Sequence, residues 1–231
     1  MCVARPCPAH PPLGVGQKDR TIQAKVRRRK GAWRAAGANA EVLQWISRGA
    51  KMRWLRRPPP RFDHGVSLRD ATPQQQIWLN EEIKRALGSG AWRRATKREH
   101  VSRVFLVKKP GVNKWRLIVD MRWLNSFCVK SKVKMETLKK LRRLAEPGDW
   151  CFSFDLQDGY HAVGIDPDFQ KYMQFDLQGQ LFQFSALPFG WSDAPRIFVK
   201  FMKVMVEALR SPGAAEDRRE LLKLKDGRVA T

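Results

Sequence analysis

The chain has 231 residues, of which 43% are hydrophobic and 10% aromatic. That apolar content supports a core and excludes a wholly disordered chain. No run approaches the roughly 18 apolar residues that a membrane span needs, and no secretory signal is visible. Lys and Arg number 45 against 22 Asp and Glu, which gives a net charge of +23. This charge predicts contact with nucleic-acid phosphates, with a soluble basic protein as the alternative interpretation.

The cysteines indicate ordinary reduced thiols rather than a metal site. They are scattered along the chain, at Cys2, Cys7, Cys128 and Cys151. A structural zinc site needs four ligands in a regular spacing, and His10, the histidine nearest to the first two cysteines, has no second ligand pair behind it. An intracellular protein is therefore expected, with its compartment, nuclear or cytoplasmic, left open.

The first part of the sequence is predicted to be a disordered basic arm over residues 1–38. It holds prolines, glycines and the run KVRRRK at residues 25–30. Such a run can bind nucleic acid, act as a nuclear signal or remain a solvated arm, and these functions are compatible.

Residues 39–96 are expected to form a helical N-terminal extension. Apolar residues at helical spacing predict a first helix over residues 41–56, which the three prolines at 58–60 end. The second helix is predicted to begin at Thr72, because threonine is a good N-cap and Pro73 suits the first helical position. Gln75 completes a capping box, and Gly88 is the predicted C-cap.

Residues 97–210 alternate between β-type and helical patterns, and residues 211–231 form a polar tail. The predicted elements are a hairpin of residues 101–107 and 115–120, a helix over 135–144, a strand over 150–155, a hairpin of residues 173–176 and 180–184, and a helix from Pro195 to about Leu209. The strand over 150–155 is apolar and ends in Asp155, which is a common way for a fold to place a catalytic carboxylate.

Three motifs in this region resemble those of reverse transcriptases. Residues 115–125, WRLIVDMRWLN, are similar to the fingers motif of retroviral and gypsy-type enzymes. Residues 154–161, FDLQDGYH, resemble the first catalytic motif of the palm, and residues 187–195, LPFGWSDAP, resemble the next palm motif. The three occur in the family's order, and the details are most similar to DIRS-like and gypsy-like retroelements.

The resemblance implies an α+β fold with right-hand polymerase fingers and a partial palm. The expected palm is an antiparallel sheet with helices on one face, preceded by the disordered basic arm. The implied activity is RNA-directed DNA polymerisation, in which two Mg²⁺ ions clamp the attacking and leaving oxygens. The implied partners are an RNA or DNA template-primer and a dNTP, with no membrane.

The resemblance also assigns roles to the residues around Asp155. This carboxylate matches the catalytic metal ligand, since Mg²⁺ prefers hard oxygen atoms, and the Leu156 carbonyl matches an assisting ligand. The amides near Asp158 and Gly159 match groups that meet the triphosphate, where glycine permits close approach. Tyr160 matches the aromatic gate that excludes a 2′ hydroxyl, with a core aromatic as the alternative.

The remaining implied contacts come from the fingers hairpin and the last motif. Lys109 and Arg116 match the basic pair that grips the β- and γ-phosphates, with solvated surface charge as the alternative. Phe189 and Gly190 are expected to shape the floor of the nucleotide site. Phe189 replaces the glutamine of retroviral enzymes and fits the gypsy branch. Asp120 is interpreted instead as a salt-bridge partner of its neighbouring arginines.

The family's second catalytic motif, Tyr-x-Asp-Asp, does not occur in these 231 residues. One carboxylate does not hold two Mg²⁺ ions tightly, so this chain alone is expected to be inactive, with the metal weakly held or absent. Two other interpretations stay open. The first is a non-catalytic nucleic-acid-binding remnant that kept the fingers as a basic platform, and the second is a remnant that never folds.

Overall fold

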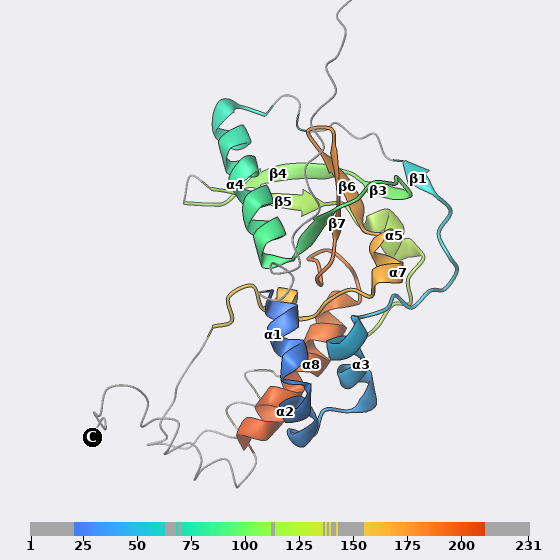
Figure 1. Cartoon of the computed structure of the whole chain (residues 1–231), viewed down its shortest axis with the longest axis vertical. Coiled ribbons are helices and arrows are strands. Elements are labelled where there is room, and N and C mark those ends of the chain that lie inside the picture. The colour runs from blue at the N-terminus through green and yellow to red at the C-terminus, as the bar shows by residue number, and fades with distance from the viewer. Residues whose placement is uncertain are drawn as a thin grey trace, which may run out of the picture.

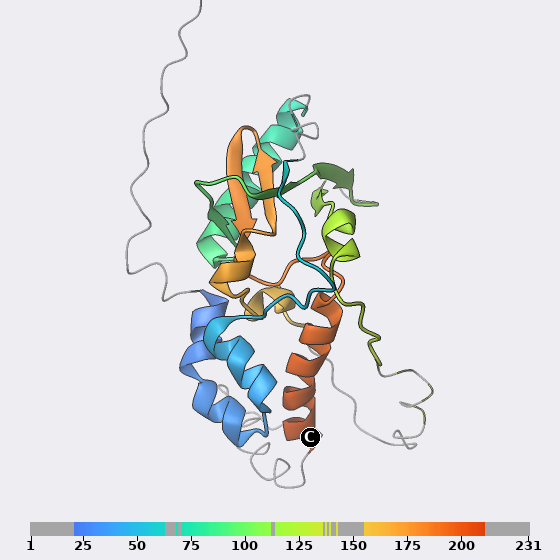
Figure 2. The ribbon, with the colours of Figure 1, turned by 90° about the vertical axis from the view of Figure 1, so that its right-hand side faces the viewer.

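The computed structural model describes residues 21–62, 68, 71–111, 114–135, 137, 139, 142 and 155–210. Two sheets and the longest N-terminal helix form one half of the molecule, and helices from both ends of the described chain form the other (Figure 1). The turned view in Figure 2 shows the same division. The expected helix over 135–144 and most of the strand over 150–155 lie outside the described residues.

The described elements follow the predicted order. The helices are α1 (Ile22–Arg28), α2 (Lys30–Ala35), α3 (Ala40–Arg48), α4 (Pro73–Ser89), α5 (Arg122–Ser126), η2 (Gly159–Ala162), α7 (Pro167–Gln170) and α8 (Ala194–Arg210). The strands are β1 (Arg61–Phe62), β2 (Trp92–Arg94), β3 (His100–Ser102), β4 (Val104–Lys108), β5 (Trp115–Val119), β6 (Gln174–Leu177) and β7 (Gln180–Phe184). The chain is thus a mixed α+β protein, as predicted.

The larger sheet has five strands in the order β1-β3-β6-β7-β2. Strand β3 runs parallel to both β1 and β6, while β6–β7 and β2–β7 pair antiparallel. The prediction of an antiparallel sheet is therefore confirmed for β6, β7 and β2 and wrong for the pairings of β3, so the sheet is mixed. Parallel neighbours need long crossovers, and here α4 lies between β1 and β3 while the β4–β5 hairpin lies between β3 and β6.

The two faces of this sheet differ in chemistry. Arg93, Gln183 and Gln174 occupy aligned positions on three neighbouring strands. Because side chains alternate along a strand, the residues next to them point to the other face. There the ring of Trp92 lies 5.0 Å from Phe175 and 6.0 Å from Phe184 in edge-on contacts. One face is therefore an aromatic core, and the other is polar and basic.

Both predicted hairpins are present. Strands β4 and β5 pair antiparallel from Val104 opposite Val119 to Lys108 opposite Trp115, as a separate two-stranded sheet. Strands β6 and β7 are joined at Gln178 and Gly179, whose φ angles of 53° and 79° are those of a tight hairpin turn. Strand β3, predicted as the start of the first hairpin, belongs to the larger sheet instead.

Helix α4 begins as predicted and ends slightly later. Thr72 accepts from the Gln75 amide, and the Gln75 side chain accepts from the Thr72 amide, which completes the capping box. The C-cap is Gly90, with φ of 73°, rather than Gly88. The helix buries Leu79 and Ala86.

The N-terminal part of the described chain corrects the expectation of disorder up to residue 38. Helices α1 and α2 form there because their apolar side chains have partners. The ring of Trp33 lies 4.3 Å from that of Phe201 on α8, and Val26 packs on the core. Gln23 also donates from its Nε2 to the His161 carbonyl at 2.7 Å. The expected arm therefore contains two consecutive short helices that are docked on the fold.

Helix α3 confirms the predicted helix but is shorter, because it ends at Gly49 with φ of 99°. Trp54 therefore lies beyond the helix, where it contacts the ring of Tyr172 at 4.9 Å. Helix α8 lies beside α3 and buries Ile197, Phe201 and Val204. Glu41 of α3 accepts from Arg196 at 3.0 Å and from Lys200 at 2.7 Å, which ties the two helices together.

Candidate nucleotide site

A cavity of about 540 Å³ lies between α4, the β4–β5 hairpin and the loops that carry Asp158 and Gly190. Its lining includes five of the predicted nucleotide-binding residues, namely Lys109, Arg116, Asp158, Phe189 and Gly190. These residues come from three separate motifs. The chain therefore brings both cations of the fingers hairpin to the same cavity as parts of both palm motifs.

The charges around this cavity are mixed, with a positive excess. Arg85, Lys109 and Arg116 are cationic, while Glu82 and Asp158 are anionic. The two acids are not free, because Arg85 contacts both of them. Lys109 and Arg116 make no ion pair within the part of the chain that the structure describes. These two cations are the ones available to an anionic ligand.

Arg85 is a residue that the sequence analysis did not identify. Its Nε and Nη2 donate to the two oxygens of Glu82 at 2.9 and 2.7 Å, and its Nη1 donates to Asp158 at 2.9 Å. The hydrogen bonds that Arg85 donates to Glu82, followed by the charge of both acids, raise the pKa of Arg85 above its ordinary value, although burial opposes this. Helix α4 is thereby fastened to the turn that follows Asp155.

The turn over residues 156–159 has an unusual backbone. Asp158 adopts φ of 52°, and the amide of Gly159 donates to the Leu156 carbonyl at 3.2 Å. A Cβ on Gly159 would lie 3.1 Å from Phe198 Cζ, so the close approach that requires glycine is to α8. The Gly159 amide already has a partner, and its predicted contact with a triphosphate stays a prediction.

Tyr160 stacks on Phe189 across two motifs. Their ring centroids lie 4.6 Å apart with an interplanar angle of 13°, and Phe198 packs on the other side of Tyr160 at 4.6 Å. Phe189 is 71% exposed, which leaves most of its surface available for contact. The predicted gate and the predicted floor of the nucleotide site are therefore one aromatic stack.

Gly190 brings the 187–195 loop against the fingers hairpin. Its φ is 94°, and a Cβ at this position would lie 3.4 Å from the Val119 carbonyl of β5. Asn125 fixes the contact from the other side, since its Nδ2 donates to the Gly190 carbonyl at 2.8 Å and its Oδ1 accepts from the Ser192 amide at 2.9 Å. One side chain of the fingers motif thus holds the palm motif in place.

Asp193 holds the 187–195 loop in place through its buried carboxylate. Its carboxylate is 2% exposed and accepts from Arg53 at 2.9 and 3.2 Å and from Arg196 at 2.8 and 2.9 Å. Burial acts to raise the pKa of Asp193, but the hydrogen bonds from Arg196 and Arg53 outweigh it and hold the pKa below its ordinary value. The loop is therefore fixed to the N-terminal extension as well as to the fingers.

Asp155, the predicted metal ligand, is exposed and does not line the cavity. Its carboxylate and the Leu156 carbonyl are oxygen donors of the kind Mg²⁺ prefers. Asp158, the acid nearest to Asp155 in sequence, is paired with Arg85 and is therefore not free to add a further oxygen ligand. No cluster of three or more metal-ligating side chains occurs among the described residues. The donors fit Mg²⁺ in kind but are too few to hold two ions.

His161 and the Asp120–Arg122 pair complete the surroundings of the site. His161 lines the cavity, is 9% exposed, and has its Nδ1 3.9 Å from Asp158. Burial lowers the pKa of His161 and keeps the ring neutral. Arg122 donates to Asp120 at 2.7 Å and lowers the pKa of Asp120 to about 2, so the predicted salt bridge is confirmed.

Part of the chain is similar to known proteins. Residues 107–215 match the family model described as "Reverse transcriptase (RNA-dependent DNA polymerase)". The matched part of the chain, a little under half of it, is therefore similar to a reverse transcriptase domain. It is also similar to the Gag-Pol polyprotein of bovine immunodeficiency virus (strain R29), with 26% identity over 162 residues. That alignment covers 63% of this chain but 11% of the viral polyprotein.

Among the described helices, none is both long and apolar enough to cross a bilayer.

Proposed function

We propose that this chain forms the fingers and the first half of the palm of an RNA-directed DNA polymerase from an LTR or DIRS-like, gypsy-related retroelement. The substrates would be an RNA or DNA template-primer and a dNTP. The observation that carries the proposal is the shared cavity, where Lys109 and Arg116 of the fingers face Asp158, Phe189 and Gly190 of the palm.

In this proposal the chain binds and orients the triphosphate end of the nucleotide. Arg116 offers a planar fork for phosphate oxygens, and Lys109 adds a compact positive charge. Arg85 offsets part of the negative charge of Glu82 and Asp158, which would otherwise repel a triphosphate more strongly. The sugar and base would rest against the stack of Tyr160 and Phe189. Tyr160 would then act as the gate against a 2′ hydroxyl.

Asp155 and the Leu156 carbonyl would hold a divalent cation in the intact enzyme. Two Mg²⁺ ions supply charge stabilisation at the transferred phosphate in reactions of this class. The 231 residues lack the Tyr-x-Asp-Asp tetrad. We infer that this chain alone holds Mg²⁺ weakly and does not extend primers.

Two measurements on the purified chain test the proposal. The first is the affinity for dATP, which should fall when Lys109 and Arg116 are both replaced by alanine and should stay unchanged in Lys84→Ala, an exposed cation of α4 outside the cavity. Equal affinity in all three proteins would refute a nucleotide site. The second is primer extension, where strong Mg²⁺-dependent activity abolished by Asp155→Ala would overturn the inferred inactivity.

The alternative is a non-catalytic nucleic-acid-binding remnant. The observation that favours it is the number of exposed cations, which exceeds what one nucleotide cavity uses. Steeply salt-dependent binding of nucleic acid, without dATP binding at the cavity, would support this alternative.

A further inference from the structure

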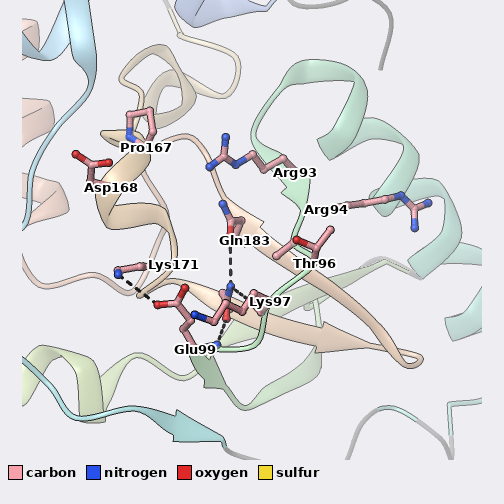
Figure 3. A pocket seen from close by; sticks show the side chains of 11 residues that line it. Arg93, Arg94, Thr96, Lys97, Glu99, Pro167, Asp168, Lys171 and Gln183 are labelled. Atoms are coloured by element: carbon pink, nitrogen blue, oxygen red, sulfur yellow. Dashed lines mark hydrogen bonds and ion pairs between the residues drawn. The ribbon is translucent and has the colours of Figure 1, made fainter. Parts of the chain in front are cut away.

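A second cavity, of about 580 Å³, lies on the polar face of the five-stranded sheet, opposite the aromatic face that meets the nucleotide cavity. It is formed by β2, the chain between β2 and β3, and the region of α7 (Figure 3). Its cationic lining residues are Arg93, Arg94, Lys97 and Lys171. Two acids, Glu99 and Asp168, also line it, so cations are in excess.

The floor of this cavity is a buried platform of two glutamines. Gln174 is 2% exposed and Gln183 is 7% exposed. Gln174 accepts from the Glu99 amide at 2.8 Å and donates to the Lys97 carbonyl at 2.8 Å, so it fixes the wall that carries both residues. With its amide oxygen turned toward β2, Gln183 accepts from Arg93 Nε at 2.7 Å and from Arg93 Nη2 at 2.9 Å.

The platform therefore presents Arg93 in a fixed position without neutralising it. Arg93 and Lys97 make no ion pair in the described part of the chain. Lys171 is paired with Glu99 at 3.3 Å, as Figure 3 shows. Arg94 points away from Gln183 in the same view and donates to Gln180 at 2.6 Å. Arg93 and Lys97 thus remain at the cavity as exposed cations without an anionic partner among the described residues.

The basic surface continues beyond this cavity. Arg93 and Pro167 also line a neighbouring cavity of about 330 Å³, together with Arg27 and Arg48. Arg27 belongs to the basic run of residues 25–30, which α1 and α2 hold against the fold. Arg27 and Arg48 are exposed, and neither makes an ion pair within the described ranges. We call Arg27, Arg48, Arg93, Lys97 and Lys171 the basic track.

The chemistry of the track points to phosphate groups on an extended ligand. No aromatic ring is among the described residues that line the larger cavity, and Trp45 and Trp92 of the smaller cavity are only 5% and 6% exposed, so a base would find little ring surface for stacking. A compact anion would need only one cluster of donors, whereas this track spans two adjoining cavities. A chain with a net charge of +23 also favours a polyanion.

We propose that the basic track binds the sugar-phosphate backbone of a single nucleic-acid strand, on the face of the sheet opposite the nucleotide cavity. The contact is independent of base sequence and does not require primer extension. It therefore goes beyond the polymerase function proposed above and gives the basic run at residues 25–30 a role.

The test measures binding of the purified chain to a fluorescent oligo-dT strand of about 12 nucleotides, a length that suits single-strand sites. The double variant Arg93→Gln, Lys97→Gln removes the two unpaired cations of the larger cavity. The matched control is Lys84→Gln, Lys203→Gln, which removes the same charge from exposed positions on α4 and α8. The variant Arg93→Lys, Lys97→Arg keeps the charge, and thermal melts establish that each protein is folded.

Affinity is measured between about 50 and about 200 mM salt, where each phosphate contact on a single strand contributes about 0.7 to the logarithmic salt slope. The test variant should lose about 1.4 from that slope, whereas the control and the charge-preserving variant should retain the slope of the unmodified chain. An unchanged slope in the test variant, or an equal loss in the control, overturns the proposal.

A second arm distinguishes the nucleic acid from a free phosphate ligand. Inorganic triphosphate and dATP are titrated into the same proteins. Both should bind the test variant as they bind the unmodified chain, because the nucleotide cavity lies on the other face. Loss of triphosphate binding with an intact oligonucleotide slope would overturn the proposal and assign the cavity to a small phosphate ligand. Failure of dATP to bind any protein would refute the nucleotide site and leave the track standing.

Discussion

Arg85 of α4 donates to the carboxylate of Asp158 at 2.9 Å, across 73 positions of the sequence. The same guanidinium holds Glu82 through two further hydrogen bonds. This one side chain therefore links the N-terminal extension to the turn after Asp155 and offsets part of the negative charge of the two acids of the nucleotide cavity.

We expect Arg85→Gln to weaken dATP binding by about three- to tenfold, the range of a partly exposed charged contact. The substitution leaves Glu82 and Asp158 without their cation, and both would then repel the triphosphate. Isothermal titration with dATP measures the effect. Lys84→Gln removes the neighbouring charge outside the cavity and should bind dATP normally. Equal losses in both variants would mean that Arg85 acts only through the net charge of the protein.

Tyr160→Ala should reduce the preference for dATP over ATP by about tenfold if the ring acts as a gate against the 2′ hydroxyl. The reason is that removal of the ring opens space beside Phe189, on which Tyr160 stacks at 4.6 Å. The ratio of the two dissociation constants is the measurement. Tyr160→Phe keeps the ring and should keep the ratio. An unchanged ratio in the alanine variant would assign Tyr160 to packing alone.

Asp193→Asn should lower the free energy of unfolding by about 2 kcal/mol, because it leaves Arg53 and Arg196 without their shared carboxylate. This expected loss of stability is smaller than for a fully buried ion pair, because Arg53 is 43% exposed. Denaturant unfolding measures it. Glu81→Gln, which removes an exposed acid of α4, should change the stability by less than about 0.5 kcal/mol.

The same carboxylate predicts a loss of stability in acid. Because the pKa of Asp193 is held below its ordinary value of 3.8, its contribution is complete above that value and is lost as the pH falls below it. Glu41, in the same cluster, has its pKa lowered from 4.5: burial opposes the shift, but the bonds from Lys200 and Arg196 outweigh it. Unfolding measured from about pH 6 to about pH 2 should show this loss, and Asp193→Asn should flatten it. Parallel curves for the two proteins would contradict the assignment.

Gly190→Ala should destabilise the fold by about 1–3 kcal/mol, the cost of holding a side chain at an unfavourable positive φ. The new methyl group would lie 3.4 Å from the Val119 carbonyl, close to ordinary van der Waals contact, so the backbone conformation accounts for the cost. Gly88→Ala provides a control of opposite sign, because that position lies within α4 and has open space around it. It should stabilise the chain by about 0.5–1 kcal/mol. Thermal and denaturant melts of both variants measure the difference.

Short sequence patterns predicted the elements that are determined by interactions between residues close in sequence. The Thr72–Gln75 capping box and the Gln178–Gly179 turn act over a few residues, and both are present as predicted. The predicted fingers hairpin and the motifs also identified Lys109, Arg116 and Phe189, which the fold brings to one cavity.

Contacts between segments that are distant in sequence could not be predicted from such short patterns. The basic composition around α1 predicted disorder, although Thr21 caps the helix through a hydrogen bond from the Ala24 amide. What decides the outcome is the packing of Trp33 on Phe201. Arg85 was missed for the same reason, since its partner Asp158 is adjacent only in the folded chain.

The docking of α1, α2 and α3 on α8 affects which range of residues is best chosen for recombinant expression. A recombinant fragment trimmed to the homology match at residues 107–215 would lack Trp33 and Glu41, and the side of α8 that carries Phe201 would face water. Such a fragment is expected to aggregate. Expression trials that retain the chain from Thr21 onward should yield the better-behaved material.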